Sequence, residues 1–391
     1  MSVLACQWTS LRPLVFGSLV ISSFLVLFFV YYKPDIKFPT FDFNMERDRP
    51  PCPVTLCAQS AQSQNSNPNC SIELHINPNH SYTQNIPAAA EDTEPDTIVL
   101  IWMWPFGFKF DLSCNIFNIR RCHLTDDRTL YNKAHGVLFH HRDIHSDLAG
   151  MPTEPRPYFQ KWVWSNMESP TNSAQNPKLN HLFNLTSNYR HDSSIPVPYG
   201  HLEPLTPEDE SFKLPAKDKL VCWIVSNWNP RYKRVQFYNE LKKHVKIHAY
   251  GNAFGQRLSN QDYSTIVSSC KFYLSFENSV HKDYITEKLF KPMMLGSVPI
   301  VLGPSRENYE DHIPGDSFIH VNDFSSAKKL SERLLYLDRS DSDYMRYFNW
   351  KNWLKVKMAL FGREHACRTC SYLQKHRGYQ AFHDLNKWYW G

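Results

Sequence analysis

The stretch KFYLSFENSVHKDYITEKL, residues 271–289, is the most informative part of the sequence because it has the order of a buried strand, a polar loop and a helix start. Residues 271–276 form the predicted strand, and Thr286 is a plausible cap for a helix over 286–295. The free N–H groups of such a helix start and the ammonium of Lys288 favour a diphosphate at the strand end, where Glu287 can hold hydroxyl groups of a ribose or sugar. A capped surface helix with both charged side chains in water fits this stretch equally well.

Apolar strands and amphipathic helices alternate on both sides of this stretch. Strands are predicted over 220–225, 245–249 and 298–302, and helices over 231–243 and 261–269. The alternation indicates a parallel α/β sheet, in which ligands bind at the carboxyl ends of the strands. The second half of the chain is therefore predicted to have a nucleotide-binding type of fold.

A second predicted strand end carries positive charge. Ser226 and Asn227 follow the strand over 220–225, and a basic helix start with Arg231, Lys233 and Arg234 comes next. The planar guanidinium of Arg can bind two phosphate oxygens at once, which Lys cannot do. Ordinary surface charge explains Arg231 and Lys233, so Arg234 is the predicted phosphate ligand.

The earlier part of the chain is less regular. Strands are predicted over 97–102, 137–140 and 161–164, and the proline- and charge-rich residues 202–219 are predicted to connect two domains. Residues 33–95 are rich in Pro, Asn, Ser and Gln and lack periodic hydrophobicity, so we expect a flexible stem.

Residues 14–32 form one uncharged apolar run that is long enough, as a helix, to span a bilayer. A small-residue cleavage site does not follow, so we expect a signal-anchor and not a removed signal peptide. The sequons at Asn69, Asn79 and Asn184 all come after the run, which favours a cytosolic tail over 1–13 and a lumenal globular part.

The charges and cysteines exclude several classes of protein. A net charge of +5 without a basic run gives no case for nucleic acid. Nine of the ten cysteines follow the apolar run, so disulfides are expected in an oxidising compartment. Cys367 and Cys370 could be half of a zinc site, but no second Cys-x-x-Cys exists.

Two other metal patterns are also weak. Asp341-Ser-Asp343 opens a helical pattern over 341–354, where Asp is an ordinary cap. In the cluster His140, His141, Asp143 and His145, adjacent strand residues point to opposite faces. We therefore predict a site without a metal and a protein that needs no cofactor.

Longer strings resemble a known family. Phe276-Glu-Asn-Ser with residues 283–289 (DYITEKL) is similar to the signature of the α-1,3-fucosyltransferases, and the match continues through residues 164–170, 197–200, 225–228 and 301–304. Residues 102–107, 140–143 and 305–309 look most like the branch that forms Lewis x.

The resemblance implies a GT-B fold, with an acceptor-binding Rossmann-like domain over 96–212, a GDP-fucose-binding one over 213–365, and a segment over 366–391 returning to the first. It implies inverting transfer of L-fucose from GDP-fucose to O3 of N-acetylglucosamine in type 2 lactosamine chains of glycoproteins and glycolipids. It also implies a type II Golgi membrane protein, which could form a homodimer through its stem or anchor.

The same resemblance assigns roles to residues. Glu168 is the expected general base, since inversion needs one base on the acceptor side and positive charge on the leaving group. Expected donor-binding residues are Arg234, Lys288, Asn278, Tyr284, Glu287, Ser226 and Asn227. Arg142 and Trp104 are expected to bind the acceptor, with Arg142 favouring type 2 chains. The implied disulfides are Cys114–Cys367, Cys122–Cys370 and Cys222–Cys270.

Two departures and two alternatives remain open. Pro292 falls inside the predicted helix over 286–295, where a kink is expected, and His191 stands where relatives commonly have a second Arg after Arg190. A lumenal glycan-binding protein on the same scaffold is one alternative, because fold does not fix function. A glycoside hydrolase is the other, because sequence cannot exclude a pair of carboxylates around a scissile bond.

Overall fold

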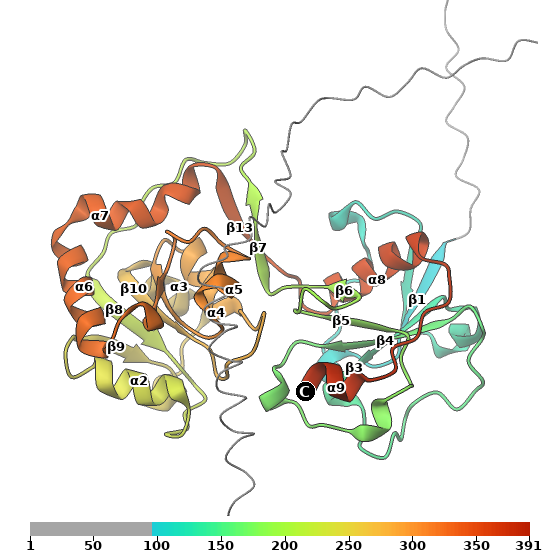
Figure 1. Cartoon of the computed structure of the whole chain (residues 1–391). Helices are drawn as coiled ribbons and strands as arrows, with labels where there is room; N and C mark the ends of the chain where they lie inside the picture. The colour runs from blue at the N-terminus through green and yellow to red at the C-terminus, as the bar shows by residue number, and fades with distance from the viewer. Residues whose placement is uncertain (1–95) are drawn as a thin grey trace, which may run out of the picture. The chain divides into compact units, whose positions relative to one another are not determined.

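The computed structural model describes residues 96–391 (Figure 1). The predicted tail, anchor and stem, with Asn69, Asn79, Cys52, Cys57 and Cys70, lie outside the described residues. Among residues 96–391, no helix combines the length and the apolar character needed to cross a bilayer.

The first half of the described chain forms a parallel sheet of six strands in the order β2-β1-β3-β4-β5-β6. The strands are β1 (Thr97–Ile101), β2 (Cys122–Thr125), β3 (Gly136–His140), β4 (Lys161–Asn166), β5 (Leu185–Asn188) and β6 (Ile195–Pro196). The strands predicted over 97–102, 137–140 and 161–164 are confirmed, whereas β2, β5 and β6 were not predicted. The connections contain only short 3-10 turns, so this half lacks the helices that make a βα pattern easy to recognise.

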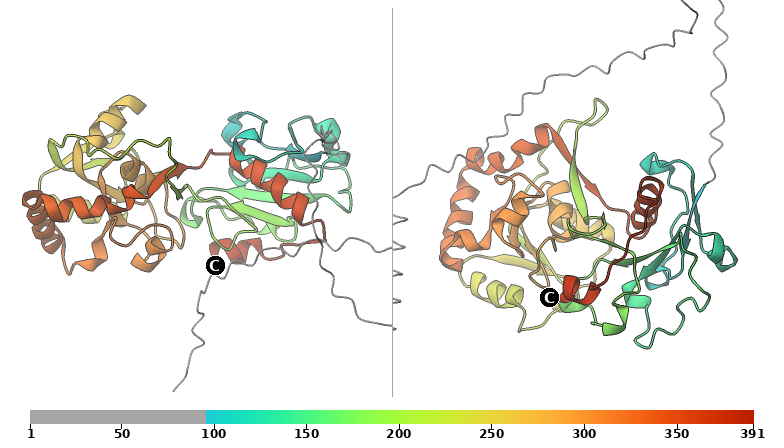
Figure 2. Two further views of the ribbon diagram at one scale, coloured as in Figure 1. Left: turned by 90° about the horizontal axis from the view of Figure 1, so that it is seen from above. Right: turned by 45° about the vertical axis from the view of Figure 1, so that its right-hand side comes forward.

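Helices from the end of the chain cover the two faces of this sheet (Figure 2). Val99 and Ile101 of β1 belong to the cluster that includes Cys367 and Cys370 of α8 (Arg363–Lys375). Leu100, one residue out of phase, faces the cluster that includes Tyr389 of α9 (Leu385–Trp390). The alternation of a strand's side chains thus buries both faces. The structure forms the expected disulfides Cys114–Cys367 and Cys122–Cys370, which tie α8 to this sheet.

The second sheet is parallel too, with the order β12-β11-β10-β8-β9. Its strands are β8 (Lys219–Ile224), β9 (Ile247–Tyr250), β10 (Cys270–Phe276), β11 (Val298–Leu302) and β12 (Ile319–His320). The helices around it are α2 (Lys233–Leu241), α3 (Asn260–Ser268), α4 (Glu287–Met294), α5 (Arg306–Glu310), α6 (Ala327–Arg339) and α7 (Asp341–Met345). Every strand and helix predicted over 220–302 is confirmed to within about two residues.

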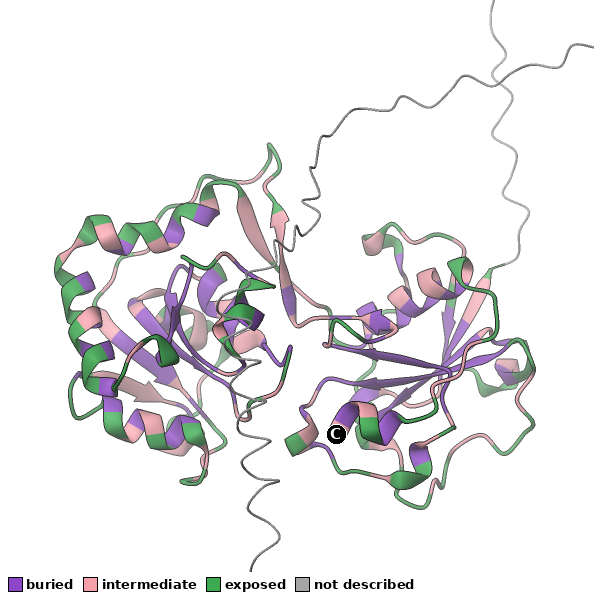
Figure 3. Ribbon diagram, viewed as in Figure 1, coloured by how far each residue is buried: buried purple, intermediate pink, exposed green. Residues whose placement is uncertain are grey.

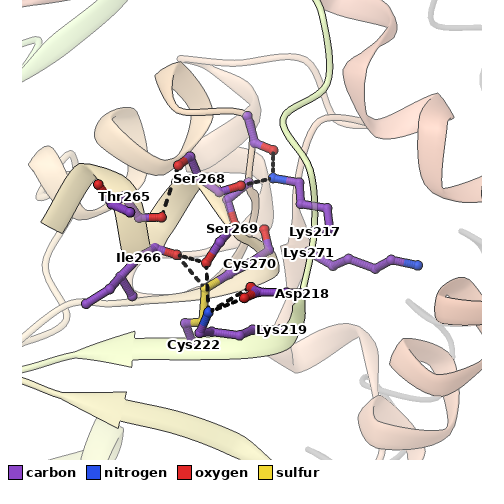
Figure 4. The surroundings of a disulfide bond; sticks show 12 residues. Lys217, Asp218, Lys219, Cys222, Thr265, Ile266, Ser268, Ser269, Cys270 and Lys271 are labelled. Atoms are coloured by element: carbon purple, nitrogen blue, oxygen red, sulfur yellow. Dashed lines mark hydrogen bonds and ion pairs between the residues drawn. A yellow bond between two sulfur atoms is a disulfide. The ribbon is translucent and has the colours of Figure 1, made fainter. Parts of the chain in front are cut away.

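The two faces of the second sheet have separate cores, and Figure 3 shows the buried strands. Val221 and Trp223 pack with residues of α2 and α6 on one face. Cys222 packs on the other with Val267 of α3, and it forms the expected disulfide with Cys270. Beside this bridge, the Lys217 ammonium donates to the carbonyls of Ser268 and Gly296 at 2.6 and 2.7 Å (Figure 4). The chain that leads into β8 is therefore fixed by hydrogen bonds.

Two sequence predictions were wrong in part. Residues 202–204, predicted to be linker, belong to β7 (Gly200–Pro204), which pairs antiparallel with β13 (Leu354–Met358). The helical pattern predicted over 341–354 begins with α7 but changes to a 3-10 helix at Arg346–Asn352, and β13 follows. Both strands were missed because residues 202–204 were assigned to a linker and a helical pattern ran up to Leu354, while the pairing joins residues about 150 positions apart.

Pro292 lies in the last turn of α4, which continues to Met294. There the missing amide hydrogen removes only the bond to the carbonyl of Lys288. The Pro292 side chain is buried, and its carbonyl accepts from the amide of Ser297 at 2.9 Å. The expected kink at Pro292 stays a prediction.

Candidate active site

Two strand ends of the second sheet bring charged side chains together, because β8 and β10 are neighbours and run parallel. The loop after β8 carries Ser226 and Asn227, and the loop after β10 leads into α4 with Lys288. Next to them, a pocket is lined by Lys233, Phe237, Gly303, His320 and Asn322 among others. The carboxyl edge of a parallel sheet is the place where such folds bind ligands.

A buried carboxylate, Glu277, organises the start of α4. It accepts hydrogen bonds from the backbone amide and the hydroxyl of Thr286, at 2.8 and 2.9 Å. The Thr286 hydroxyl also caps α4 by accepting from the amide of Lys288. The predicted cap is therefore confirmed, and Glu277 fixes its position.

The ammonium of Lys288 lies between two carboxylates, 3.6 Å from Glu277 and 3.0 Å from Glu287. Burial lowers the pKa of Lys288, but the two carboxylates together outweigh burial and raise it, so the ammonium stays charged. Burial raises the pKa of the Glu277 carboxyl, and Lys288 partly offsets this. The cluster of two carboxylates and one ammonium holds a permanent cation at the strand end.

Arg234 supplies the second cation from α2. Its side chain is 3% exposed and donates to the carbonyl of Asn227. Its buried Nε has no hydrogen-bond partner within residues 96–391. Because leaving a buried donor of a charged group unpaired is costly, the Nε is suited to an anionic ligand.

The remaining expected donor-site residues differ in how they are held. Asn278 is half-buried and accepts from the hydroxyl of Ser279 at 3.2 Å. Ser226 and Asn227 are exposed, and Asn227 contacts Arg234 through its carbonyl. The structure thus gathers the loop after β8 around Arg234 and the loop after β10 around Glu277.

Glu168 follows β4 of the first sheet and contacts the loop after β10. Its Oε2 lies 3.5 Å from the hydroxyl of Tyr284, at the outer limit of a hydrogen bond. Its backbone amide donates to Asn166 Oδ1 at 3.1 Å. The loop that carries the expected base therefore contacts the loop that carries the expected donor-binding residues.

Tyr284 lies in an aromatic group with Tyr189 and Tyr199, at ring distances of 5.2 and 6.2 Å. Burial, together with Glu277 and Glu168, raises the pKa of the Tyr284 phenol well above its ordinary value. Tyr284 is thus a permanent hydrogen-bond donor and not an acid at neutral pH.

The C-terminal helix α9 supports Glu168 from behind. The Tyr389 hydroxyl donates to the carbonyl of Glu168, and the Nδ2 of Asn166 donates to that hydroxyl at 3.2 Å. The Tyr389 ring packs on Trp164 of β4 at 4.9 Å. Helix α9 therefore fixes the backbone around the expected base.

Further hydrogen bonds join the same loops. Ser279 donates to Ser169 at 2.7 Å, and Thr171 and His281 share a hydrogen bond of 2.7 Å. These four side chains flank Glu168 and Asn278 in sequence, so they set the spacing between the base loop and the loop after β10.

The two residues expected to bind an acceptor have different partners in the structure. The exposed Arg142 donates to the carbonyl of Asn172 at 3.2 Å and lies over the Phe106 ring at 5.7 Å. The Trp104 indole donates to Asp126 instead, at 3.1 Å. Arg142 therefore lies next to the loop that follows Glu168, and the Trp104 indole is held by Asp126.

Asn184, a predicted glycan acceptor, is nearly buried, and its Nδ2 donates to the carbonyl of Gln380 at 2.7 Å. An attached glycan would leave one N–H on this nitrogen, so attachment stays a prediction. It requires the glycan to be added before the C-terminal segment closes over Asn184.

Residues of the two weak metal patterns, the histidine cluster and Asp341-Ser-Asp343, have hydrogen-bond or ion-pair partners within the protein. His140 pairs with Asp143 at 2.6 Å, whereas the His141 ring contacts the indole of Trp164 and the carbonyl of Ala174. Asp343 accepts from Tyr336 and Ser340. In the part of the chain that the structure describes, one three-residue cluster has metal-ligand spacing: His191, Asp283 and His312.

Sequence reasoning missed two residues that shape the site. Glu277 belongs to the Phe276-Glu-Asn-Ser string, but the sequence analysis gave it no role. Its position directly after a buried strand could have marked it as a candidate site residue. Tyr389 gave no signal, because its contact with Glu168 joins residues 221 positions apart.

Comparison with known proteins identifies matching families and relatives. A family model described as fucosyltransferase, N-terminal, matches residues 94–200, and one described as glycosyltransferase family 10 (fucosyltransferase) C-term matches residues 214–388. A Mus musculus protein named 4-galactosyl-N-acetylglucosaminide 3-alpha-L-fucosyltransferase 9 is 54% identical over 288 residues, covering 73% of this chain and 80% of its own. The Homo sapiens protein of that name gives the same values.

Two more distant matches were also found. A Bos taurus alpha-(1,3)-fucosyltransferase 7 is 42% identical over 279 residues, covering 71% of this chain and 80% of its own. A crystal structure of an alpha1,3-fucosyltransferase with GDP-fucose aligns at 17% identity and a TM-score of 0.49, covering 74% of this chain and 93% of that one. A structural likeness this weak carries no argument about the site.

Proposed function

Because the chain belongs to glycosyltransferase family 10, the fucosyltransferases, we propose that it transfers L-fucose from GDP-fucose to O3 of N-acetylglucosamine in type 2 lactosamine. The name shared by its 54% identical relatives specifies a 4-galactosylated N-acetylglucosamine and a 3-α linkage, which fits this acceptor. The observation that carries the proposal is the contact of Tyr284 with Glu168, since it joins the expected base to the loop that leads into α4 and Lys288.

Each step of the proposed reaction can be assigned to a residue of the site. The Glu168 carboxylate takes the proton from the acceptor O3, this oxygen bonds to C1 of fucose with inversion, and the bond from C1 to the β-phosphate oxygen breaks. Arg234 and Lys288 neutralise the negative charge that develops on GDP. These two cations supply the charge that a metal supplies elsewhere, so the proposal includes no metal and no cofactor in this step.

The donor is held by groups that are already fixed. Glu277 and the Thr286 cap position Lys288, and the Asn227 carbonyl positions Arg234. Asn278, Tyr284 and Glu287 are proposed to position the phosphates and the ribose, and Ser226 and Asn227 to line the same site. Groups that are fixed before the reaction lose little reorganisation energy during it.

We further propose that the two parallel sheets form a GT-B arrangement and that Arg142, beside the loop after Glu168, contacts the acceptor. Residues 14–32 are proposed to anchor the chain as a type II Golgi membrane protein, with lumenal glycans at the sequons. Full-length protein made in cells should lose mass on treatment with an N-glycosidase. Equal mass before and after treatment would contradict the lumenal topology.

The direct test incubates purified protein with GDP-fucose and type 1 or type 2 lactosamine, followed by linkage analysis of the product. The proposal predicts a 3-linked α-fucoside on type 2 chains and released GDP. Binding of lactosamine without turnover would support a glycan-binding protein instead, and cleavage of lactosamine would support a hydrolase.

A further inference from the structure

The His191–Asp283–His312 cluster joins the two loops that frame the site but takes no part in the proposed reaction. One ligand atom from each residue lies within 4.8 Å of the others. His191 follows β5 of the first sheet, whereas Asp283 belongs to the loop after β10, and His312 comes two residues after α5. The cluster is therefore built from three elements that are separate in sequence.

Asp283 is held rigidly. Its Oδ1 accepts from Asn308 Nδ2 at 2.7 Å, and its Oδ2 accepts from the backbone amide of His191 at 3.1 Å. Its own amide donates to Asn308 Oδ1 at 2.7 Å, although the residue has a φ of +60°. A non-glycine residue in the left-handed region is strained, so these bonds keep the carboxylate in one place. They also leave lone pairs of both oxygens free.

His312 provides an unpaired donor atom inside the cluster. Its side chain is 6% exposed, and its Nε2 lies 3.8 Å from Asp283 Oδ1, too far for a hydrogen bond. This buried nitrogen has no hydrogen-bond partner among the described residues. The His191 ring packs on the His312 ring at 4.3 Å and 30° and is itself exposed. A buried nitrogen without a hydrogen-bond partner is available to bind a ligand, and the adjacent His191 side chain is exposed to solvent.

We propose that His191, Asp283 and His312 bind one divalent transition-metal ion, with Zn²⁺ the best match. Two imidazoles and one carboxylate are a common zinc donor set, and water would fill the fourth position. Bonds of about 2.1 Å place tetrahedral ligand atoms about 3.4 Å apart, so the ligand atoms, which lie within 4.8 Å of one another, need to close by at most about 1.4 Å. Asn308 then holds the bound carboxylate as an outer ligand.

The ion would tie the loop after β5 to the loop after β10, one residue before Tyr284. Its role is structural, since no step of the proposed transfer passes through it. The proposal is independent of the transfer reaction, and metal binding tests it even in a protein without turnover.

The experiment measures Zn²⁺ binding to chelator-treated whole protein by calorimetry, and repeats it with Co²⁺, whose absorption reports tetrahedral coordination. The variants are His191→Ala and His312→Ala, and the control is His123→Ala, an exposed histidine on β2. Wild type and control should bind one ion with tetrahedral Co²⁺ bands and gain thermal stability. Each cluster variant should bind at least about tenfold more weakly.

Two results would overturn the proposal. One is a wild-type protein that binds no Zn²⁺ at micromolar concentration. The other is equal Zn²⁺ affinity in His191→Ala and His123→Ala. Because His191 is exposed, its replacement leaves the core intact, and a folding defect in His312→Ala would not obscure the outcome.

Discussion

Replacing Glu168 by Gln removes a base while preserving shape. The side-chain carbonyl of the glutamine can still accept from the Tyr284 hydroxyl, which lies 3.5 Å from Glu168 Oε2, and the backbone bonds to Asn166 and Tyr389 remain. The amide cannot take a proton from the acceptor O3. General-base catalysis contributes about 10²–10⁴-fold, or about 2.7–5.4 kcal/mol of the barrier.

We therefore expect kcat of Glu168→Gln to fall by at least about 100-fold, with the thermal midpoint and the GDP affinity unchanged. Initial rates of GDP release with lactosamine measure kcat, and calorimetry measures GDP binding. The matched control is Glu210→Gln, an exposed carboxylate in the chain between β7 and β8. A folded Glu168→Gln protein with a rate within about tenfold of the control would refute the role of Glu168 as base.

Three other changes test the surroundings of the site. Tyr389→Phe loses one hydrogen bond to the Glu168 carbonyl, which contributes about 0.5–1.5 kcal/mol. We therefore expect kcat to fall about 2–10-fold while the GDP affinity stays constant. An unchanged kcat would show that α9 does not position Glu168 for catalysis. Lys288→Ala leaves the buried Glu277 carboxylate unpaired and should cost about 3–5 kcal/mol of stability, compared with the exposed Lys213→Ala. Since burial raises the pKa of Glu277, protonation favours the folded state, so the Lys288→Ala deficit should shrink as the pH falls from about 8 toward about 5; a deficit independent of pH would contradict this. The double variant Cys222→Ser, Cys270→Ser removes a disulfide that links residues 48 positions apart. The loop-entropy model predicts that this lowers the free energy of unfolding by about 4 kcal/mol. A thermal midpoint equal to wild type would show that the Lys217 hydrogen bonds and the strand pairing hold this region without the disulfide.

The second sheet could be predicted from the sequence because its apolar strands are separated by amphipathic helices of ordinary length. The pairing of all three disulfides was predicted from the family resemblance and not from the spacing of the cysteines. The first sheet was only half predicted, since 3-10 turns replace its helices. The sequence of β13 alternates Leu354, Val356 and Met358 with lysines, a strand signal that a helical interpretation of the preceding residues concealed.

The site shows a similar division. Lys288 and the Thr286 cap could be predicted because a helix start has a local signature. The buried state of Glu277 could not, since it depends on the neighbouring strands β8 and β11. Tyr389 and the His191–Asp283–His312 cluster depend on contacts between distant parts of the chain, which no local pattern encodes.

In the proposed reaction, the strand ends of β8 and β10 bind a guanosine diphosphate through Arg234 and Lys288. Calorimetry of GDP binding to the folded protein tests it most directly, with Arg234→Met as the variant and the exposed Arg231→Met as the control. We expect one GDP per chain for wild type and control, and at least about tenfold weaker binding for Arg234→Met, since a charge-assisted hydrogen bond contributes about 1.5–3 kcal/mol. Folded wild-type protein that binds no GDP, or equal affinity in the two Arg variants, would contradict it.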